Sequence, residues 1–188
     1  RIQPEWAEKL AGDTVKRTGD LLDTLPIGQP FDWVDKVSME LTTQMLAILF
    51  DFPWEKRRDL TRWSDILGNI ETFVSHESRA FRHQNMMEMA MSFGALWQEK
   101  AKNPGEHDLI SIMLRSEAMS HMDQQEFIGN LILLIVGGND TTRNSISGGV
   151  LALNQNPIEY RKLNSDPSLI TSMVPEIIRW QTPLAHMR

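Results

Sequence analysis

The sequence predicts an all-α fold, and two observations support this. Apolar residues recur at steps of three and four along almost all of the 188-residue chain, which is the spacing of one buried helix face. Strict apolar–polar alternation, typical of half-buried strands, is scarce, and proline or glycine stops divide the chain into helix-sized segments. The length suits one domain or a piece of something larger, so residues 1–188 are expected to form a single helical unit.

The first two predicted helices are separated by a proline–glycine stop. One starts at Pro4 and ends at the Leu-Pro-Ile-Gly sequence of residues 25–28. The next starts near Asp32 and closes at residues 52–53, Phe-Pro. Their apolar stripes comprise Leu10, Leu21 and Leu25 in the first helix and Val34, Val37, Leu41, Met45 and Leu49 in the second.

Three further helices are expected between about residues 60 and 114. A methionine-rich helix covers about residues 86–102 and stops at the Asn-Pro-Gly turn of residues 103–105. A short helix follows over residues 109–114. The helix that precedes both carries an apolar stripe made of Leu60, Trp63, Leu67 and Ile70.

A long central helix is predicted over about residues 123–154. Asp123 and Glu126 form a capping-box pattern at its start. An unbroken helix of about 32 residues would measure about 48 Å at about 1.5 Å per residue, enough to cross a domain. Its apolar spacing continues through Leu131, Leu134, Ile146 and Val150.

The last three predicted helices are each placed by a proline. Pro157 and Pro167 open two short helices. A final helix is predicted over about residues 174–181, because Pro175 is tolerated in the first turn of a helix but disrupts the interior.

The composition narrows the possible functions. With 25 acidic and 19 basic side chains the net charge is −6, which disfavours nucleic acid as the main partner. The chain has no cysteine and its histidines lack metal-binding spacing, so no metal ligand is expected within it. The longest apolar run, residues 131–136, is far shorter than the roughly 18 residues of a membrane span, and no secretory leader is recognisable. A cytoplasmic protein is therefore expected.

The long helix contains Gly-Gly-Asn-Asp-Thr-Thr at residues 137–142. Each glycine costs roughly 1 kcal/mol relative to alanine inside a helix, so a specific need for the pair is expected. Three interpretations are open. The helix ends here and Asp140 or Thr141 caps another, or residues 131–136 are a strand before a phosphate-binding turn. In the third, one helix lets a flat cofactor or small ligand approach closely, with Asp140 and Thr141 handling protons.

Glu176 and Arg179 lie three residues apart, which places a carboxylate and a guanidinium on the same helical face. Alone, such a pair is usually a surface ion pair worth less than about 1 kcal/mol. When this pair follows the glycine motif of residues 137–142, in this order and at this separation, the combination is a more specific signal than either motif alone.

Together the two motifs resemble those of the cytochrome P-450 superfamily of haem-thiolate monooxygenases. Glu176 and Arg179 fit its E-x-x-R motif, and residues 51–65 resemble its bacterial members. More narrowly, residues 137–147 and 175–183 resemble bacterial alkane and fatty-acid terminal hydroxylases. The residues that fit the family's [A/G]-G-x-[D/E]-T-[T/S] motif are Gly137, Gly138, Asp140, Thr141 and Thr142.

The resemblance implies that this chain is the helical core portion of a mainly-α fold. Family members are about twice as long and bind haem iron through a cysteine in a loop beyond the E-x-x-R helix. Neither that loop nor the family's N-terminal sheet region has a counterpart here. The chain is therefore expected to be an internal fragment of one larger catalytic domain, inactive alone.

The resemblance also implies roles for the central helix. Dioxygen would lie at the glycine–threonine turn, where Gly137 and Gly138 leave room for it. Thr141 would hydrogen-bond the oxygen, and Asp140 would relay protons from solvent. Substrate would face Leu133, Val136 and Leu184.

The same resemblance implies structural roles for three residues near the end of the chain. Glu176 and Arg179 would join a later arginine in a buried ion network, whose disruption costs several kcal/mol. Arg188 would contact a haem propionate.

The function implied is insertion of one oxygen atom of O2 into an unactivated C–H bond by haem b. The substrates would be apolar, namely medium-chain alkanes or fatty acids hydroxylated at the terminus, and electrons from NAD(P)H would arrive through a ferredoxin and its reductase. An alternative is a related enzyme that oxidises sterols or terpenes. An alternative from another class is a non-catalytic α-helical ligand-binding or regulatory domain.

Overall fold

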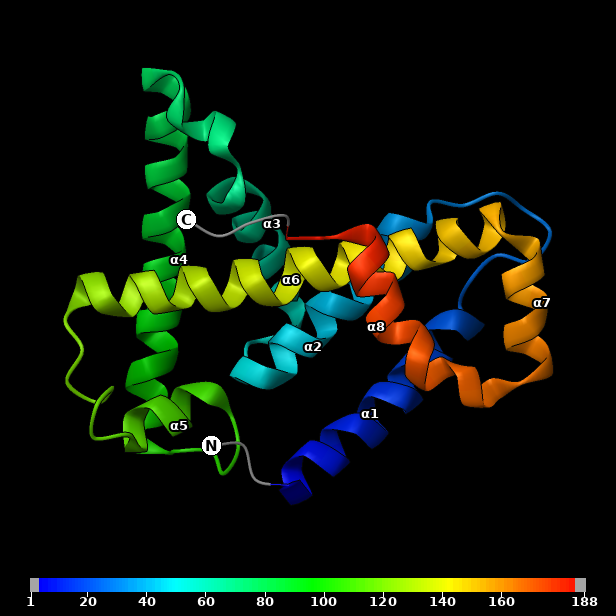
Figure 1. Ribbon diagram of the computed structural model, residues 1–188. Helices are drawn as coiled ribbons and strands as arrows, with labels where there is room; N and C mark the ends of the chain where they lie inside the picture. Colours follow the sequence, from blue (N-terminus) through cyan, green and yellow to red (C-terminus); the bar gives the residue numbers. More distant parts are fainter. Residues whose placement is uncertain (1–3, 185–188) are drawn as a thin grey trace.

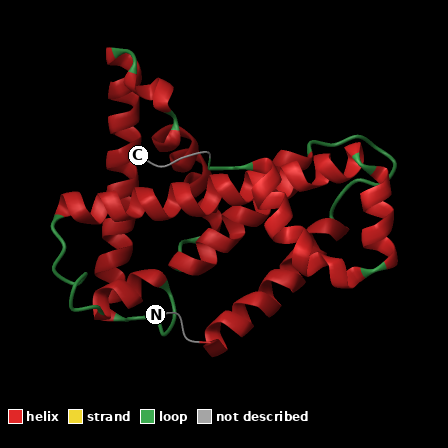
Figure 2. Ribbon diagram, viewed as in Figure 1, coloured by secondary structure: helices red, strands yellow, loops and turns green. Residues whose placement is uncertain are grey.

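The computed structural model describes residues 4–184, and this part of the chain consists of helices and loops with no strand (Figures 1 and 2). The predicted all-α class is confirmed. Short helical turns are η1 (Val34–Met39, π-helical), η2 (Trp54–Lys56), η3 (Ile70–Phe73) and η4 (Pro167–Leu169). The α-helices are α1 (Pro4–Asp23), α2 (Glu40–Phe50), α3 (Arg57–Gly68), α4 (His76–Lys102), α5 (Leu109–Arg115), α6 (Gln124–Gln155), α7 (Pro157–Ser165) and α8 (Ile170–Gln181).

The helix α6 crosses the middle of the molecule and contacts α2, α3, α7 and α8 (Figure 1). A capping box starts it: the Asp123 carboxylate accepts a hydrogen bond from the Glu126 amide at 2.8 Å, and the Glu126 carboxylate accepts one from the Asp123 amide at 3.4 Å. The helix then continues through Gly137 and Gly138 without a break. The two interpretations that place a helix end or a strand in this segment are therefore wrong.

The helices α2, α3, α4 and α6 bury one apolar core. The rings of Phe50 and Phe93 meet edge to face with centroids 5.1 Å apart, and Trp63 packs edge to face on Phe52 at 6.0 Å. Leu131 of α6 is fully buried in the same cluster. Burial of each such side chain contributes roughly 1.5–3 kcal/mol, so this core fixes α6 relative to the other three helices.

Three local features differ from the predictions. The methionine-rich helix, predicted from about residue 86, is α4 and starts at His76, because Ser75 and Ser78 form a capping box there. The sequence predicts the E-x-x-R helix to start near residue 174, but α8 starts at Ile170 and contains Pro175 in its interior. A proline there removes one backbone donor, and the carbonyl left without it belongs to Thr171, which is exposed to water. Ile70, predicted on an apolar stripe, is 80% exposed because α3 ends at Gly68 and the chain turns into η3.

Candidate functional site

Two hydroxyl groups hydrogen-bond back to the α6 backbone beside the glycines. Thr141 Oγ1 donates to the carbonyl oxygen of Gly137 at 2.8 Å, and Ser145 Oγ donates to the carbonyl oxygen of Thr141 at 2.8 Å. Such bonds slightly destabilise the helix and favour a bend. The hydroxyl proton of Thr141 is fixed along the helix, while its oxygen still has lone pairs that accept a hydrogen bond from a ligand.

The two glycines have different surroundings. A β-carbon at Gly137 would meet no side chain or neighbouring backbone atom of residues 4–184 within 4 Å, so in this part of the chain the residue borders open space. A β-carbon at Gly138 would lie 3.0 Å from Cδ2 of Leu46 on α2. Close packing on α2 gives one physical reason for the glycine at 138, whereas the described residues leave space for a β-carbon at 137. The oxygen-binding role that the resemblance implies for both glycines stays a prediction.

Asp140 is joined to α3 through one guanidinium. Arg143 donates from Nη2 to Oδ1 of Asp140 at 2.5 Å and from Nη1 to Oδ1 of Asp65 at 2.9 Å. Burial lowers the pKa of Arg143, but the hydrogen bonds to the two carboxylates outweigh this effect and raise it above its usual range. Arg143 therefore stays positively charged between the two acids.

Glu176 and Arg179 form a bidentate ion pair on α8. Arg179 Nε donates to Oε2 of Glu176 at 2.7 Å and Nη2 donates to Oε1 at 2.6 Å. These bonds lower the pKa of Glu176 and raise that of Arg179. Both side chains are more than half exposed, and within residues 4–184 the pair has no third charged partner. The described residues therefore do not supply the burial that the resemblance implies, because α8 packs on α6 and η4 without covering this pair.

The comparisons with known proteins agree on one family, although no protein-family model matches the chain. The structure of cytochrome P450-153 from Novosphingobium aromaticivorans superposes with a TM-score of 0.90 at 50% identity, over 99% of this chain and 45% of that one. CYP153D17 from Sphingomonas sp. PAMC 26605 gives a TM-score of 0.81 at 50% identity, over 95% and 44%. Linalool 8-monooxygenase from Pseudomonas putida is 31% identical over 100% of this chain and 47% of its own length.

The chain belongs to the cytochrome P450 family. It spans about half the length of the relatives it matches.

A cavity of about 500 Å³ lies between α6 and α8 of this cytochrome P450 segment. Cytochrome P450 proteins bind haem, a flat and largely apolar group with polar propionates. The residues present fit such a group, because Gly137 borders open space and the cavity beside Thr141 is walled mainly by aliphatic side chains. The walls include Ile146, Val150, Val174, Ile178 and Pro183.

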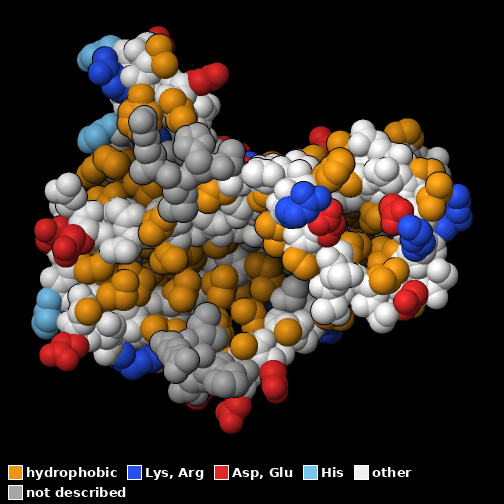
Figure 3. Space-filling model, in the orientation of Figure 1, with side chains coloured by type: hydrophobic (Ala, Val, Ile, Leu, Met, Phe, Trp, Pro, Cys, Tyr) orange, Lys and Arg blue, Asp and Glu red, His pale blue; other side chains and the backbone are white. Residues whose placement is uncertain are grey.

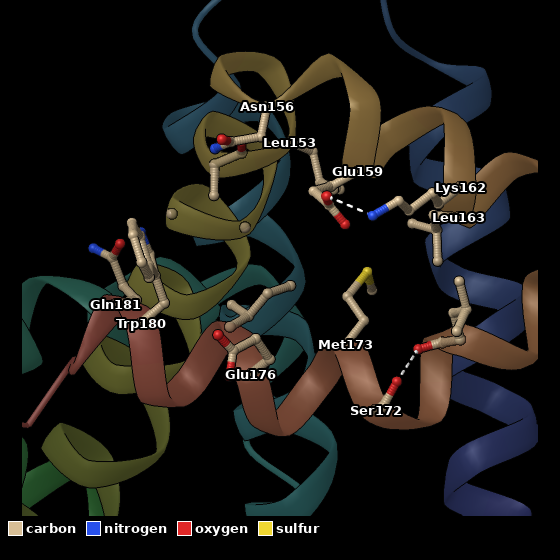
Figure 4. Close-up of a pocket in the computed structure, with 15 residues that line it drawn as sticks. Leu153, Asn156, Glu159, Lys162, Leu163, Ser172, Met173, Glu176, Trp180 and Gln181 are labelled. Atoms are coloured by element: carbon tan, nitrogen blue, oxygen red, sulfur yellow. Dashed lines mark hydrogen bonds and ion pairs between the residues drawn. The ribbon is translucent and has the colours of Figure 1, made fainter.

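A second cavity, of about 610 Å³, opens between α6, α7 and α8 (Figure 4). Glu176 lies at its α8 side near Met173, and an ion pair between Lys162 and Glu159 lies across from them on α7, at 2.9 Å (Figure 4). The acid of the E-x-x-R pair of this cytochrome P450 therefore borders a cavity that faces solvent.

The three predicted substrate residues are only partly brought together. Leu133 and Val136 lie three residues apart on α6 and so share one face. Leu133 is 63% exposed, whereas Cγ1 of Val136 lies 3.2 Å from the position of a β-carbon at Gly68 on α3. Leu184 follows α8 and is 55% exposed. Figure 3 shows hydrophobic side chains below α6 on the face of the molecule that is turned to the viewer.

Three other expectations concern metals, membranes and Arg188. Between residues 4 and 184, no group of three or more His, Asp or Glu side chains is placed to hold a metal ion. In the same part of the chain, none of the helices combines the length and hydropathy needed to cross a bilayer. Arg188, the predicted propionate partner, lies outside the described residues.

Sequence reasoning missed Arg143 and Asp65. The spacing of three residues between Asp140 and Arg143 is itself a signal for an ion pair on one helical face. No sequence pattern points to Asp65, which precedes Arg143 by 78 residues.

Proposed function

We propose that the whole protein is a haem-dependent monooxygenase that inserts one oxygen atom of O2 into an unactivated C–H bond, and that this chain supplies its oxygen-side helix. The observation that carries the proposal is the uninterrupted α6, in which Gly137 borders open space and Thr141 borders the apolar cavity. Haem, when bound, supplies the oxidising chemistry.

The chain's own residues would control water, protons and position. The oxygen of Thr141 accepts a hydrogen bond at the cavity, while its own proton is held by the Gly137 carbonyl. Asp140, half-buried on the neighbouring position of α6, exchanges protons with solvent and passes them toward Thr141. The aliphatic walls contributed by Val150, Val174 and Ile178 offer no hydrogen bonds to stray water.

For the substrate we propose medium-chain alkanes or fatty acids, hydroxylated at the terminus. One support is that residues 137–147 and 175–183 resemble the sequences of bacterial alkane and fatty-acid terminal hydroxylases. The other is that Leu133, Val136 and Leu184 have aliphatic side chains. Linalool 8-monooxygenase, 31% identical, favours a terpene substrate as the second candidate. Electrons from NAD(P)H delivered by a ferredoxin and its reductase, and a cytoplasmic location, remain part of the proposal.

The test uses the full-length protein encoded with its flanking sequence, purified with haem and supplied with a ferredoxin, its reductase and NAD(P)H. The proposal expects the carbon-monoxide difference spectrum of thiolate-ligated haem and ¹⁸O from ¹⁸O2 in the product. Octane, dodecanoic acid and linalool, assayed side by side, distinguish the two substrate candidates. Absence of ¹⁸O from every product would instead favour the non-catalytic ligand-binding domain.

Two variants sharpen this experiment. Thr141→Ala should lower the fraction of NAD(P)H electrons recovered in product by about tenfold, with more peroxide released, because the proton path loses its hydroxyl. The 188-residue chain alone should give no thiolate spectrum, because it contains no cysteine. Unchanged coupling in Thr141→Ala would remove Thr141 from proton delivery.

A further inference from the structure

The guanidinium of Arg143 connects the candidate proton-relay residue to a different helix. Its two terminal nitrogens are used separately: Nη2 bonds to Asp140 at 2.5 Å and Nη1 bonds to Asp65 at 2.9 Å. The side chain of Arg143 is 14% exposed, compared with 43% for Asp140 and 44% for Asp65. The arginine is thus the buried centre of the group, and each acid reaches it from a more exposed side.

This arrangement restrains Asp140 more strongly than a helix-surface pair does. A solvated pair three residues apart samples several rotamers and contributes little. Here Arg143 is anchored at its second nitrogen by Asp65, and α3 is held against α6 by extensive contacts that include Val136 and Gly68. Because the planar guanidinium directs its donors rigidly, fixing one arm also fixes the direction in which the other meets Asp140.

Within residues 4–184, only one carboxylate oxygen of Asp140 accepts a hydrogen bond. Oδ1 accepts from Arg143, and no hydrogen bond within the described residues is directed at Oδ2. An aspartate held by one oxygen keeps the other available to take up or release a proton.

We propose that Arg143 is a positioning residue for Asp140, and that Asp65 on α3 holds Arg143 in place. The inference rests on the proposed function, in which Asp140 relays protons. The proposal adds a group of three residues, Asp65, Arg143 and Asp140, which we call the clamp. Through the clamp, the position of α3 determines the orientation of the Asp140 carboxylate.

The experiment uses the full-length haem enzyme and the variants Arg143→Gln, Asp140→Asn and the double variant. Arg143→Gln should lower product formed per NAD(P)H by about tenfold, while the substrate dissociation constant changes less than about twofold. The expected loss is smaller than the roughly hundredfold or greater effect of removing an acid–base group, because Asp140 itself is still present. In the double variant, the loss should be no greater than in Asp140→Asn alone, because Arg143 acts through Asp140. If the fold-losses of the two single variants multiply in the double variant, Arg143 does not act through Asp140. That result would overturn the proposal and assign Arg143 a merely structural role.

Asp65→Asn tests the outer arm of the clamp. It should give a partial loss of coupling, and the combination with Arg143→Gln should lose no more coupling than Arg143→Gln alone. Lys16→Gln, which removes an exposed ion pair with Asp20 on α1, is the matched control and should leave coupling unchanged. Full coupling in Asp65→Asn would overturn the role of α3.

A crystal structure of the Arg143→Gln enzyme provides a readout other than activity. The Asp140 carboxylate should occupy a different or mixed rotamer, and an unchanged carboxylate would overturn the proposal. If the wild-type enzyme forms no oxygenated product, the proposed function fails, whereas this structural comparison still decides whether Arg143 positions Asp140.

Discussion

Replacing Gly137 and Gly138 separately with alanine should separate two roles that the sequence presents as one. Alanine is favoured over glycine by about 1 kcal/mol in a helix interior. At residue 137 the new methyl group meets no side chain or neighbouring backbone atom of the described residues within 4 Å, so Gly137→Ala should raise the free energy of unfolding by up to about 1 kcal/mol.

At residue 138 the same gain is opposed by packing. The new methyl group would lie 3.0 Å from Cδ2 of Leu46, which is 4% exposed and part of the core. Overpacking of this kind costs about 1–3 kcal/mol, so Gly138→Ala should lower the free energy of unfolding by up to about 2 kcal/mol. Urea unfolding of the full-length protein, with haem content measured in parallel, gives both values.

Of these two variants, Gly137→Ala should be the more stable but the less active. The methyl group at 137 fills the open space beside the Thr141 back-bond, where the proposed function places dioxygen, so product formation should fall in the more stable variant. A Gly137→Ala enzyme that is fully active would refute the assignment of that space to oxygen. A Gly137→Ala protein less stable than Gly138→Ala would refute the packing argument.

Three further predictions concern stability. Lys100→Met should lower the free energy of unfolding by about 3 kcal/mol in urea titrations, because it leaves the buried carboxylate of Asp108 without its ammonium partner. Burial raises the pKa of Glu40, but hydrogen bonds and the nearby arginine charges outweigh it and lower the pKa below its usual range. A lowered folded-state pKa stabilises the protein above the unfolded value and loses that contribution as pH falls through the folded value, so Glu40→Gln should flatten the acid limb of a stability–pH curve below about pH 4.5. Phe93→Ala, which empties a fully buried site in the aromatic cluster, should lower the free energy of unfolding by about 3–5 kcal/mol.

Most of the helices could be predicted from the sequence because their signals are local. The capping box at Asp123 and the proline at Pro157 depend on residues within one helical turn, and α6 and α7 start where these signals place them. The start of α8 could not be predicted in this way. Pro175 predicts a first turn, but the helix extends back to Ile170. The carbonyl that loses its donor belongs to Thr171, an exposed residue, so the lost hydrogen bond costs less there than in a buried segment.

The sequence by itself determined the all-α class, the long central helix and the motif pair that identifies the cytochrome P450 family, because periodicity, capping and motif spacing are all encoded along the chain. Tertiary structure alone decided that Gly138 meets Leu46, that Gly137 faces open space, and that Arg143 is shared with Asp65. Each of these depends on which face of α6 meets α2 or α3, and that is set by burial of a common core between residues far apart in the chain.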